Sequence, residues 1–441
     1  MATTLGARRT ATQPPGPKLP QAVQTVLFGK YRATWMPRLR RHYGDVFTVR
    51  IAPRNRHMVT IADPELIKSI FNTSSTALHP GEGNAILGPI MGAHSVLLLD
   101  EAEHVRVRQL LMPAFHGAPM RGYQDMITRL SRAEVDTWPV GVDFRTHDRT
   151  TALTLEIILQ VVFGVTDDAR LAELRPVVQE IVRADVMIMM GWFYPALQRF
   201  WPWRRFHRLQ REFDRLLYAE IAARRTATDL TERTDVLSRL LTAGATNGAK
   251  ALTDAELRDN LVTLLLAGHE TTATALAWTF HELARNPDVL ARAQQAADEN
   301  DAAYLEAVVK ESLRIRPVIS EVARMVKEPI EVGGFTVPAG ATIMPGIQLV
   351  QQDANNHREP ERFVPSRYLD GQPAPNTWIP FGGGVRRCLG AGFSLMEATV
   401  VLGQVLRQYG LGTGGRPAER AKSRNITLTP ARGGTVVLTR R

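Results

Sequence analysis

Apolar residues recur every three or four positions over most of the region from Glu101 to about residue 310, a spacing that predicts an almost wholly helical core. Shorter apolar segments at Val46–Ile51 and Met58–Ile61 flank Pro and Asn residues and predict a β-hairpin. Strand character returns over residues 326–345, where Gly and Pro mark the turns. The chain is therefore predicted to be mainly α with a minor β portion.

Several element boundaries are also marked. Residues 31–43 form an amphipathic helical pattern that Gly44 closes. Asp63-Pro64-Glu65 is a typical helix start, because Asp caps free N–H groups and Pro fits the first turn. A further helix is expected near residues 389–408, after a Gly-rich loop, and two short strands near residues 425–429 and 435–439.

Two segments have less regular patterns. Residues 79–95 are rich in Gly and Pro and predict a long loop, and such loops are often functional. Residues 186–203 are apolar and rich in Met and Trp. They fit either a core segment or a mobile lid over a lipophilic pocket, because Met and aromatic side chains adapt to varied shapes.

The chain of 441 residues shows no internal repeat and is expected to form one domain over residues 21–441. Residues 1–20 are Pro-rich and are expected to be a disordered tail. This segment has neither the apolar region of a secretory signal nor a run long enough to span a bilayer. We therefore expect a cytoplasmic protein, without a membrane anchor, that is a monomer.

The amino-acid composition excludes several classes of binding site. One cysteine excludes an intramolecular disulfide, a zinc site made of cysteines and an iron–sulfur cluster held by the chain. The net charge of +10 has no accompanying nucleic-acid-binding motif, so a basic surface that docks an acidic protein partner is the better interpretation. No Gly-rich nucleotide loop is complete, so NAD(P)H, if it is used, must bind to a partner.

The single cysteine has an unusual context. Cys388 follows Phe381-Gly-Gly-Gly-Val-Arg-Arg and precedes Leu-Gly390. A lone cysteine is more often an inert core residue. Here, however, the glycines allow the backbone to turn tightly beside a flat ligand, and nearby arginines and free N–H groups favour a thiolate. The segment is therefore interpreted as a loop that ligates iron.

A second segment lies in the long helix predicted between Asn260 and Pro287, around Ala267-Gly268-His269-Glu270-Thr271-Thr272. Glycine and two threonines are poor helix formers. These residues are either tolerated at random in the helix or weaken it locally for a functional reason. In the second case Gly268 admits a flat ligand, and the Thr271 hydroxyl bonds back to the preceding turn. Glu270 and Thr271 would then supply a carboxylate and a hydroxyl for proton transfer.

Three weaker motifs accompany these segments. Glu311 and Arg314 are spaced to pair on one helix face, and Arg362 of Pro360-Glu-Arg-Phe363 could complete a buried Glu–Arg–Arg cluster. His104 and Arg108 lie one helical turn apart and suit a pair of carboxylates, although a solvated basic face is as plausible when they are taken alone.

Together, in this order, the segments resemble the cytochrome P450 family over essentially the whole chain. The cysteine loop follows the family pattern Phe-x-x-Gly-x-Arg-x-Cys-x-Gly at every specified position. The resemblance is to soluble bacterial members of the family. The N-terminal segment and the segment from His94 to His116 are similar to those of actinobacterial members. It implies a helix-rich prism in which haem lies between the oxygen-activating helix and the cysteine loop.

The resemblance also implies residue roles. Cys388 would ligate the iron of haem b, and Thr271 with Glu270 would deliver protons to dioxygen. The other implied haem contacts are Ala267, Gly268, Phe381, Gly382 and Gly390, and the implied propionate ligands are His104, Arg108, Arg324 and Arg386. Glu311, Arg314 and Arg362 would form a structural cluster behind the cysteine loop. Ser320 and Glu321 would fall near the substrate, where a carboxylate could select substrate polarity.

The leading hypothesis is a monooxygenase that inserts one oxygen atom from O2 into a lipophilic substrate, such as a fatty acid, steroid or terpenoid. Its electrons would come from NAD(P)H through a ferredoxin reductase and a ferredoxin. One alternative is a haem-thiolate peroxygenase or isomerase, against which the Glu270-Thr271 pair argues. The other is a non-catalytic haem or lipid sensor.

Overall fold

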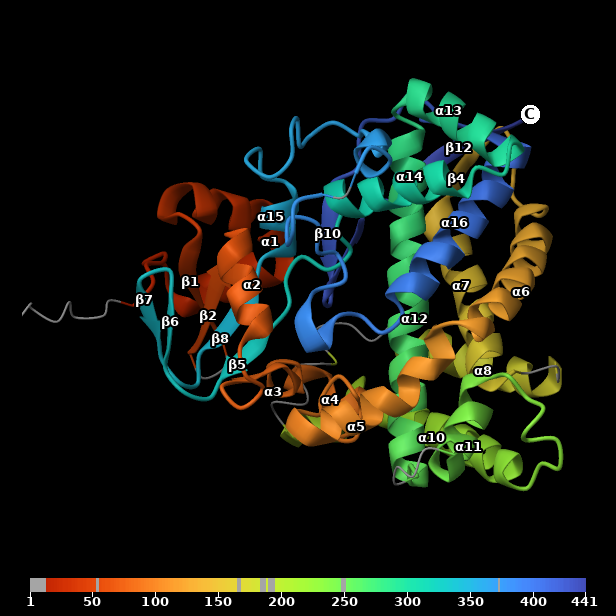
Figure 1. Ribbon diagram of the computed structural model, residues 1–441, viewed down its shortest axis with the longest axis horizontal. Coiled ribbons are helices and arrows are strands. Elements are labelled where there is room, and N and C mark those ends of the chain that lie inside the picture. Colours follow the sequence, from red (N-terminus) through yellow and green to blue (C-terminus); the bar gives the residue numbers. More distant parts are fainter. Residues whose placement is uncertain are drawn as a thin grey trace, which may run out of the picture.

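The computed structural model describes residues 13–52, 55–164, 168–182, 188, 195–246, 251–371 and 373–441. A large helical part lies beside a smaller part that contains the main sheet and α1 (Figure 1). The helices are α1 (Gln21–Tyr43), α2 (Pro64–Asn72), α3 (Pro80–Gly83), α4 (Gly88–Met91), α5 (Glu101–Leu111), α6 (Ala118–Val135), α7 (Thr146–Phe163), α8 (Asp168–Val182), α10 (Trp203–Arg225), α11 (Val236–Thr246), α12 (Asp254–Leu283), α13 (Pro287–Asp298), α14 (Ala302–Ile315), α15 (Ile347–Gln351) and α16 (Ala391–Gln408).

The strands are short. They are β1 (Val46–Ile51), β2 (Arg56–Ile61), β3 (Leu78–His79), β4 (Asp143–Arg145), β5 (Arg324–Val326), β6 (Ile330–Val332), β7 (Phe335–Val337), β8 (Thr342–Pro345), β9 (Tyr409–Gly412), β10 (Ala421–Arg424), β11 (Thr427–Pro430) and β12 (Thr435–Arg440). The main sheet has the order β1-β2-β8-β5-β3, and β4-β12-β9, β10-β11 and β6-β7 form smaller sheets. The prediction of a mainly helical chain with a minor β portion is confirmed.

Helix α12 runs through the middle of the helical part (Figure 1). Thr253 and Glu256 form a capping box at its start, which satisfies N–H groups that a helix end leaves free. Along most of its length α12 is buried on every side, because α7 and other helices surround it. Hydroxyls of α7 donate to carbonyls of α12, Thr154 to His269 at 3.0 Å and Thr150 to Ala273 at 3.1 Å. These bonds fix one face of α12 and leave another for the site.

Most predicted elements have their expected places. The hairpin is confirmed, since β1 and β2 pair antiparallel, and Asp63 caps α2 by accepting from the N–H of Leu66 at 2.8 Å. The helix expected at residues 31–43 begins earlier, at Gln21. Residues 79–95 are not one open loop but a series of short helical turns that includes α3 and α4.

Residues 1–20 were expected to form a disordered tail, and for residues 14–17 this prediction is wrong. The N–H of Thr48 in β1 donates to the carbonyl of Pro15 at 2.7 Å, and Gln24 donates to Pro17 at 3.1 Å. These bonds hold the segment against the sheet. Residues 1–12 lie outside the described residues.

The segment 186–203, interpreted as a core segment or a lid, lies mostly outside the described residues, which include only residue 188 and residues 195–203 of it. Within the described part of the chain, none of the helices combines the length and the apolar composition that a membrane span requires.

Candidate functional site

The glycine-rich loop before Cys388 packs against α2. The N–H of Cys388 donates to the carbonyl of Phe381 at 2.9 Å and closes the loop. A Cβ at Gly383 would come within 2.2 Å of the Phe71 ring, and one at Gly384 within 2.3 Å of the Phe71 carbonyl oxygen. These two glycines are therefore required by the approach of α2, and not by a flat ligand as the sequence suggested.

Other positions of the loop face open space. A Cβ at Gly382 or at Gly390 would meet no atom within 4 Å, and Gly382 has a φ of +66°, which favours glycine. Cys388 is itself exposed. The loop therefore presents its thiol on the side where space remains for a ligand.

The surroundings of the Cys388 sulfur have opposing effects on its charge. Although the residue is exposed, atoms packed around the sulfur desolvate it, and burial raises the pKa of the thiol. The N–H of Gly390 and the charges of Arg108 and Arg387 lower that pKa. A bound cation deprotonates a coordinating thiol outright, and the same N–H group and arginines would then stabilise the thiolate.

A cluster of basic side chains lies next to this loop. Arg386 donates to the carboxylate of Asp100 at 2.6 Å, and Arg108 donates to the carbonyl of Arg387 in the cysteine loop at 2.8 Å. Arg324 is buried, with its guanidinium carbon 4.7 Å from the centroid of the Phe71 ring. Elements far apart in the sequence thus bring together side chains that were predicted to share a ligand.

The pKa values of this cluster show that its charges repel one another. Burial, followed by the charges of Arg386 and Arg108, lowers the pKa of His104 to about 4. Burial and the charge of Arg386 lower the pKa of Arg324 to about 10. Burial also lowers the pKa of Arg386 to about 10, against the opposing effect of Asp100. Among the described residues, Asp100 is the carboxylate that pairs with these arginines, so an anionic ligand would relieve the repulsion.

The face of α12 at Ala267 is open, in contrast to the rest of that part of the helix. Ala267 is exposed and Leu266 and Thr271 are half-buried, whereas the residues on either side are buried. The hydroxyl of Thr271 donates to the carbonyl of Ala267 at 2.7 Å, as the sequence predicted. The helix nevertheless continues without a break, so the expected loosening of the turn is not observed.

Gly268 has a different role from the predicted one. A Cβ at this position would lie 2.8 Å from Cδ1 and 2.9 Å from Cγ1 of Ile158 in α7. The absent side chain therefore faces a neighbouring helix, and glycine at this position allows α7 and α12 to pack closely.

Glu270 is a buried carboxylate with one strong partner. Its Oε1 lies 3.2 Å from Nη1 of Arg424 at the end of β10, and neither oxygen has a hydrogen bond within the described chain. His147 lies 3.9 Å away, but burial lowers its pKa to about 4, so it is neutral near pH 7. Burial raises the pKa of Glu270, and Arg424 opposes this effect. The carboxyl group is therefore placed to exchange a proton.

Behind the cysteine loop, Glu311 is fully buried and accepts two hydrogen bonds from Arg314, at 2.7 and 2.9 Å. The third member of this cluster is Arg367, whose Nε lies 3.3 Å from Glu311 Oε1. The prediction that Arg362 fills this place is wrong. The Arg362 side chain is 62% exposed and pairs with Glu359, and only its carbonyl contacts Arg314.

The two residues predicted near the substrate lie at the segment before β5. The Ser320 hydroxyl is buried, and the structure gives it no hydrogen-bond partner among the described residues. Glu321 lies 3.5 Å from Arg32 of α1, and both side chains are largely buried. Arg32 also donates to carbonyls of the β10–β11 hairpin. Glu321 therefore ties α1 to this segment, and a role in selecting substrate polarity is not supported.

Several residues of the site were not predicted from the sequence. Arg367 could have been found, because Pro365-Ser366-Arg367-Tyr368 repeats the spacing of Pro360-Glu-Arg-Phe363. Asp100 and Arg424 gave no signal, since their partners lie far away in the sequence. Glu397 of α16 is likewise new: it is fully buried, and burial raises its pKa well above the usual value against the opposing effect of Thr272.

The residues present fit a haem. One exposed cysteine borders open space, the exposed face of α12 at Ala267 offers a flat apolar surface, and a repelling cluster of buried cations requires anions such as two propionates. The described residues hold no group of three or more His, Cys, Asp or Glu side chains that could bind a metal ion by themselves. Iron held by a macrocycle and one axial thiolate agrees with this donor set.

Comparison with known proteins gives the same assignment. The family model described as Cytochrome P450 matches residues 14–436. A Mycobacterium tuberculosis protein provisionally named cytochrome P450 135A1 is 49% identical over 434 residues, covering 98% of this chain and 96% of that protein. A Mycobacterium bovis protein provisionally named cytochrome P450 135B1 is 41% identical over 429 residues, covering 96% and 90%.

Two solved structures share the fold. A retinoic-acid-bound cyanobacterial CYP120A1 superposes with a TM-score of 0.86 at 20% identity, covering 98% of this chain and all of that one. The haem domain of cytochrome P450DA gives a TM-score of 0.82 at 22% identity, covering 98% and 99%.

Proposed function

Because the chain belongs to the cytochrome P450 family and is a haem-thiolate monooxygenase, we propose that its substrate is a lipophilic molecule and that a ferredoxin supplies its electrons. The bound haem supplies the iron at which dioxygen is activated, so that one oxygen atom enters the substrate. The residues of this chain bind that group, exclude water from it and move protons.

Cys388 would hold the iron, and its thiolate would be stabilised by the N–H of Gly390 and by Arg108. His104, Arg324 and Arg386 would bind the propionates together with Arg108, which removes the repulsion within the basic cluster. Arg386 is already paired with Asp100, so the propionates would be bound mainly by the charges of Arg324 and Arg108.

Glu270 and Thr271 would carry protons to the open face of α12. Burial raises the pKa of Glu270, which favours the protonated form that can donate a proton, and Arg424 at the hairpin links it towards the surface, because Arg424 is 37% exposed. Thr271 lies next to it in the chain, and its hydroxyl faces the Ala267 carbonyl.

The observation that carries the substrate class is the character of the open space at Ala267. Leu266 and Ala267 border it, and Glu270, the buried carboxylate of the same helix, is paired with Arg424. An apolar surface without a free charge favours an apolar molecule, such as a fatty-acid chain, a steroid or a terpenoid.

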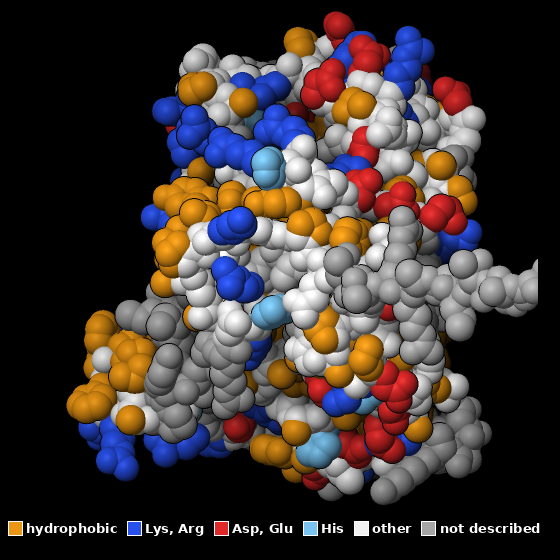
Figure 2. Space-filling view, turned by 90° about the vertical axis from the view of Figure 1, so that its left-hand side faces the viewer, with side chains coloured by type: hydrophobic (Ala, Val, Ile, Leu, Met, Phe, Trp, Pro, Cys, Tyr) orange, Lys and Arg blue, Asp and Glu red, His pale blue; other side chains and the backbone are white. Residues whose placement is uncertain are grey.

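The electron partner is proposed from charge. The net charge is +10, and Figure 2 shows that it is unevenly spread, with Lys and Arg gathered at the upper left of the face and Asp and Glu at the upper right. At the cysteine loop, Arg387 is exposed and Val385 is 66% exposed. An apolar contact beside a cation suits a small acidic ferredoxin, whose association would weaken with salt.

The test uses the purified haem-bound protein. Long-chain alcohols, steroids and terpenoids are expected to change the Soret absorption, and turnover should require O2, NADPH, ferredoxin and reductase together. Replacing Ala267 with Leu should weaken binding of these ligands when binding is measured per bound haem, whereas Ala219→Leu, on the exposed surface of α10, should not. Binding of polar compounds alone, or turnover that persists without ferredoxin, would contradict the proposal.

A further inference from the structure

Phe71, near the end of α2, is held in place by the glycine-rich loop that leads to Cys388. A Cβ at Gly383 would lie 2.2 Å from Cδ2 and 2.5 Å from Cε2 of the Phe71 ring, and one at Gly384 would lie 2.3 Å from the Phe71 carbonyl oxygen. The residue is also buried in the hydrophobic cluster of the main sheet. The ring therefore cannot shift towards the loop unless the loop backbone moves with it.

The guanidinium group of Arg324 lies over the same ring. Its central carbon is 4.7 Å from the centroid of the Phe71 ring, within the range of a cation–π contact. Nη2 of Arg324 donates to the carbonyl of Gly383 at 3.4 Å. Arg324 is buried, and within the described part of the chain no carboxylate pairs with it. An aromatic ring and a loop carbonyl thus restrain a buried cation.

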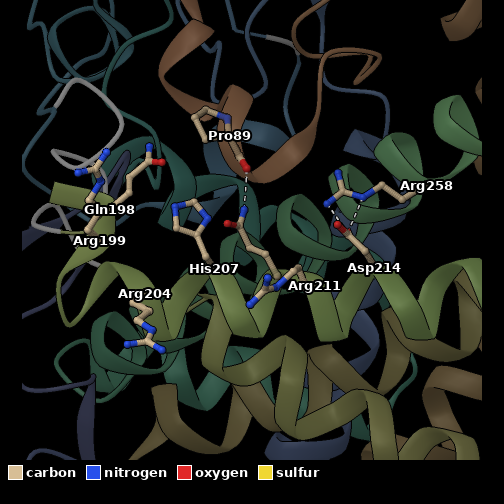
Figure 3. Close-up of a pocket in the computed structure, with 9 residues that line it drawn as sticks. Pro89, Gln198, Arg199, Arg204, His207, Arg211, Asp214 and Arg258 are labelled. Atoms are coloured by element: carbon tan, nitrogen blue, oxygen red, sulfur yellow. Dashed lines mark hydrogen bonds and ion pairs between the residues drawn. The ribbon is translucent and has the colours of Figure 1, made fainter. Parts of the chain in front are cut away.

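Arginine side chains at another place show why such a restraint matters. A pocket of about 630 Å³ lies between α4, α10 and the start of α12. The exposed residues Arg199, Arg204 and Arg211 line it, and their guanidinium groups point in different directions (Figure 3). Arg258, in contrast, is held by two hydrogen bonds to Asp214, at 2.6 and 2.8 Å. The direction of an arginine side chain is set by the group that holds it.

A restrained guanidinium group is a better ligand for a carboxylate. A free arginine side chain loses rotamer entropy when it binds an anion, and a side chain already held in the bound orientation loses less. A contact with the flat face of the group leaves its N–H donors at the edge free for two parallel hydrogen bonds to a carboxylate. The Phe71 ring restrains Arg324 without using these donors.

We propose that Phe71 is a positioning residue, which holds the Arg324 guanidinium in the orientation that binds a haem propionate. The inference rests on the proposed role of Arg324 as a propionate ligand and extends that role to α2. Because Gly383 and Gly384 hold Phe71, the same contact sets the position of Arg324 relative to the loop that carries Cys388.

The test measures how fast the purified, haem-bound, full-length protein loses haem to an excess of apomyoglobin. Phe71→Leu keeps an apolar side chain but removes the flat ring, whereas Phe71→Tyr keeps the ring. The control Phe335→Leu makes the same change in β7, where the side chain packs against the same hydrophobic cluster. Each Phe71 variant is also combined with Arg324→Gln and with Arg108→Gln, which remove one propionate-binding charge each.

Phe71→Leu should speed haem loss by about fivefold or more, the size expected for a desolvated cation–π contact. Phe71→Tyr and Phe335→Leu should stay within about twofold of the original rate, because both keep the contact with Arg324. In the Arg324→Gln background Phe71→Leu should have almost no further effect, since no guanidinium group remains to be positioned. In the Arg108→Gln background the two effects should multiply.

Three outcomes would overturn the proposal. Equal acceleration by Phe71→Leu in both arginine backgrounds would show a general loosening of the haem site. A non-multiplying effect with Arg108→Gln as well as with Arg324→Gln would assign the effect to the cysteine loop. Acceleration by Phe71→Tyr as large as that by Phe71→Leu would show that the ring itself is not required. If Phe71→Leu is purified without haem, Phe71→Met takes its place in the same comparisons.

The result can be separated from that of the proposed function. If Arg324→Gln leaves haem loss unchanged, the proposed role of Arg324 as a propionate ligand fails. If Arg324→Gln speeds haem loss but Phe71→Leu does not, that role stands and the positioning role of Phe71 fails.

Discussion

The Nε atom of Arg367 lies 3.3 Å from Oε1 of Glu311, a fully buried carboxylate that also accepts two hydrogen bonds from Arg314. The N–H of Val364 donates to the same oxygen at 2.8 Å. One carboxylate on α14 thus fixes both its own helix and the segment at residues 364–367. This segment leads into the cysteine loop.

Arginine-to-glutamine variants should separate the roles in this cluster. Arg314→Gln leaves the Glu311 charge buried and should lower the free energy of unfolding by about 3–5 kcal/mol. Arg367→Gln should cost about 1–3 kcal/mol. Arg362→Gln is the control, and its cost should stay within about 0.5 kcal/mol, because its side chain is exposed. Urea unfolding measures all three, and equal costs for Arg362→Gln and Arg367→Gln would be inconsistent with this cluster.

Gly268 should resist the smallest enlargement. Gly268→Ala places a methyl group 2.8 Å from Ile158 Cδ1 and should cost about 1–3 kcal/mol, although alanine favours helices. Ile158→Ala removes both Cδ1 and Cγ1, the two atoms that the methyl group would meet, so the double variant should lose less than the sum of the single ones. Gly122→Ala in α6 is the control, since its Cβ would meet nothing within 4 Å. A strictly additive double variant would show that the two side chains do not compete for the same space.

Acid should destabilise the protein through its buried histidines. Burial lowers the pKa of His269 to about 4, against about 6.5 in an unfolded chain. Below pH 6.5 the unfolded state therefore binds a proton that the folded state does not, and stability falls as the pH drops from 6.5 towards 4. The expected slope is up to about 1.4 kcal/mol per pH unit for this residue.

His269→Gln should reduce that slope, because the amide keeps a donor for the Leu265 carbonyl but does not titrate. His42→Gln, at an exposed position of α1, is the control and should leave the slope unchanged. Thermal unfolding at pH 5, 6 and 7 provides the measurement. An unchanged slope in His269→Gln would mean that this histidine is not held neutral.

Glu270 and Arg424 should act as a unit in turnover. Glu270→Gln removes the titrating group and should slow turnover by about 100-fold or more at unchanged haem content. Arg424 lowers the pKa of Glu270, so Arg424→Gln should raise that pKa and move the pH dependence of turnover to higher pH. Arg420→Gln, exposed in the same region, is the control. A pH profile that does not move in Arg424→Gln would remove Arg424 from the proton path.

The features that the sequence predicted correctly are those formed between residues close together in the chain. The bond from Thr271 to Ala267, the cap at Asp63 and the turn before Cys388 are local, so residue type and spacing define them. The family was recognisable for the same reason: its motifs are short segments in a fixed order.

The sequence could not supply contacts made across the fold. Gly268 and Gly383 are glycines because Ile158 and Phe71 approach them, and neither neighbour is visible from local sequence. The pairing of Glu270 with Arg424 likewise joins residues more than 150 positions apart. The literal tetrapeptide around Arg362 was misleading, because only the fold shows which of two similarly spaced arginines reaches Glu311.

The most direct test of iron ligation by Cys388 is the absorption spectrum of the purified, reduced protein under carbon monoxide, compared with that of Cys388→Ala. Ligation of the iron by Cys388 predicts the strongly red-shifted Soret band of thiolate-ligated haem in the original protein and its loss in the variant. A band typical of histidine ligation, or a red-shifted band that survives in Cys388→Ala, would contradict the assignment of Cys388 as the iron ligand.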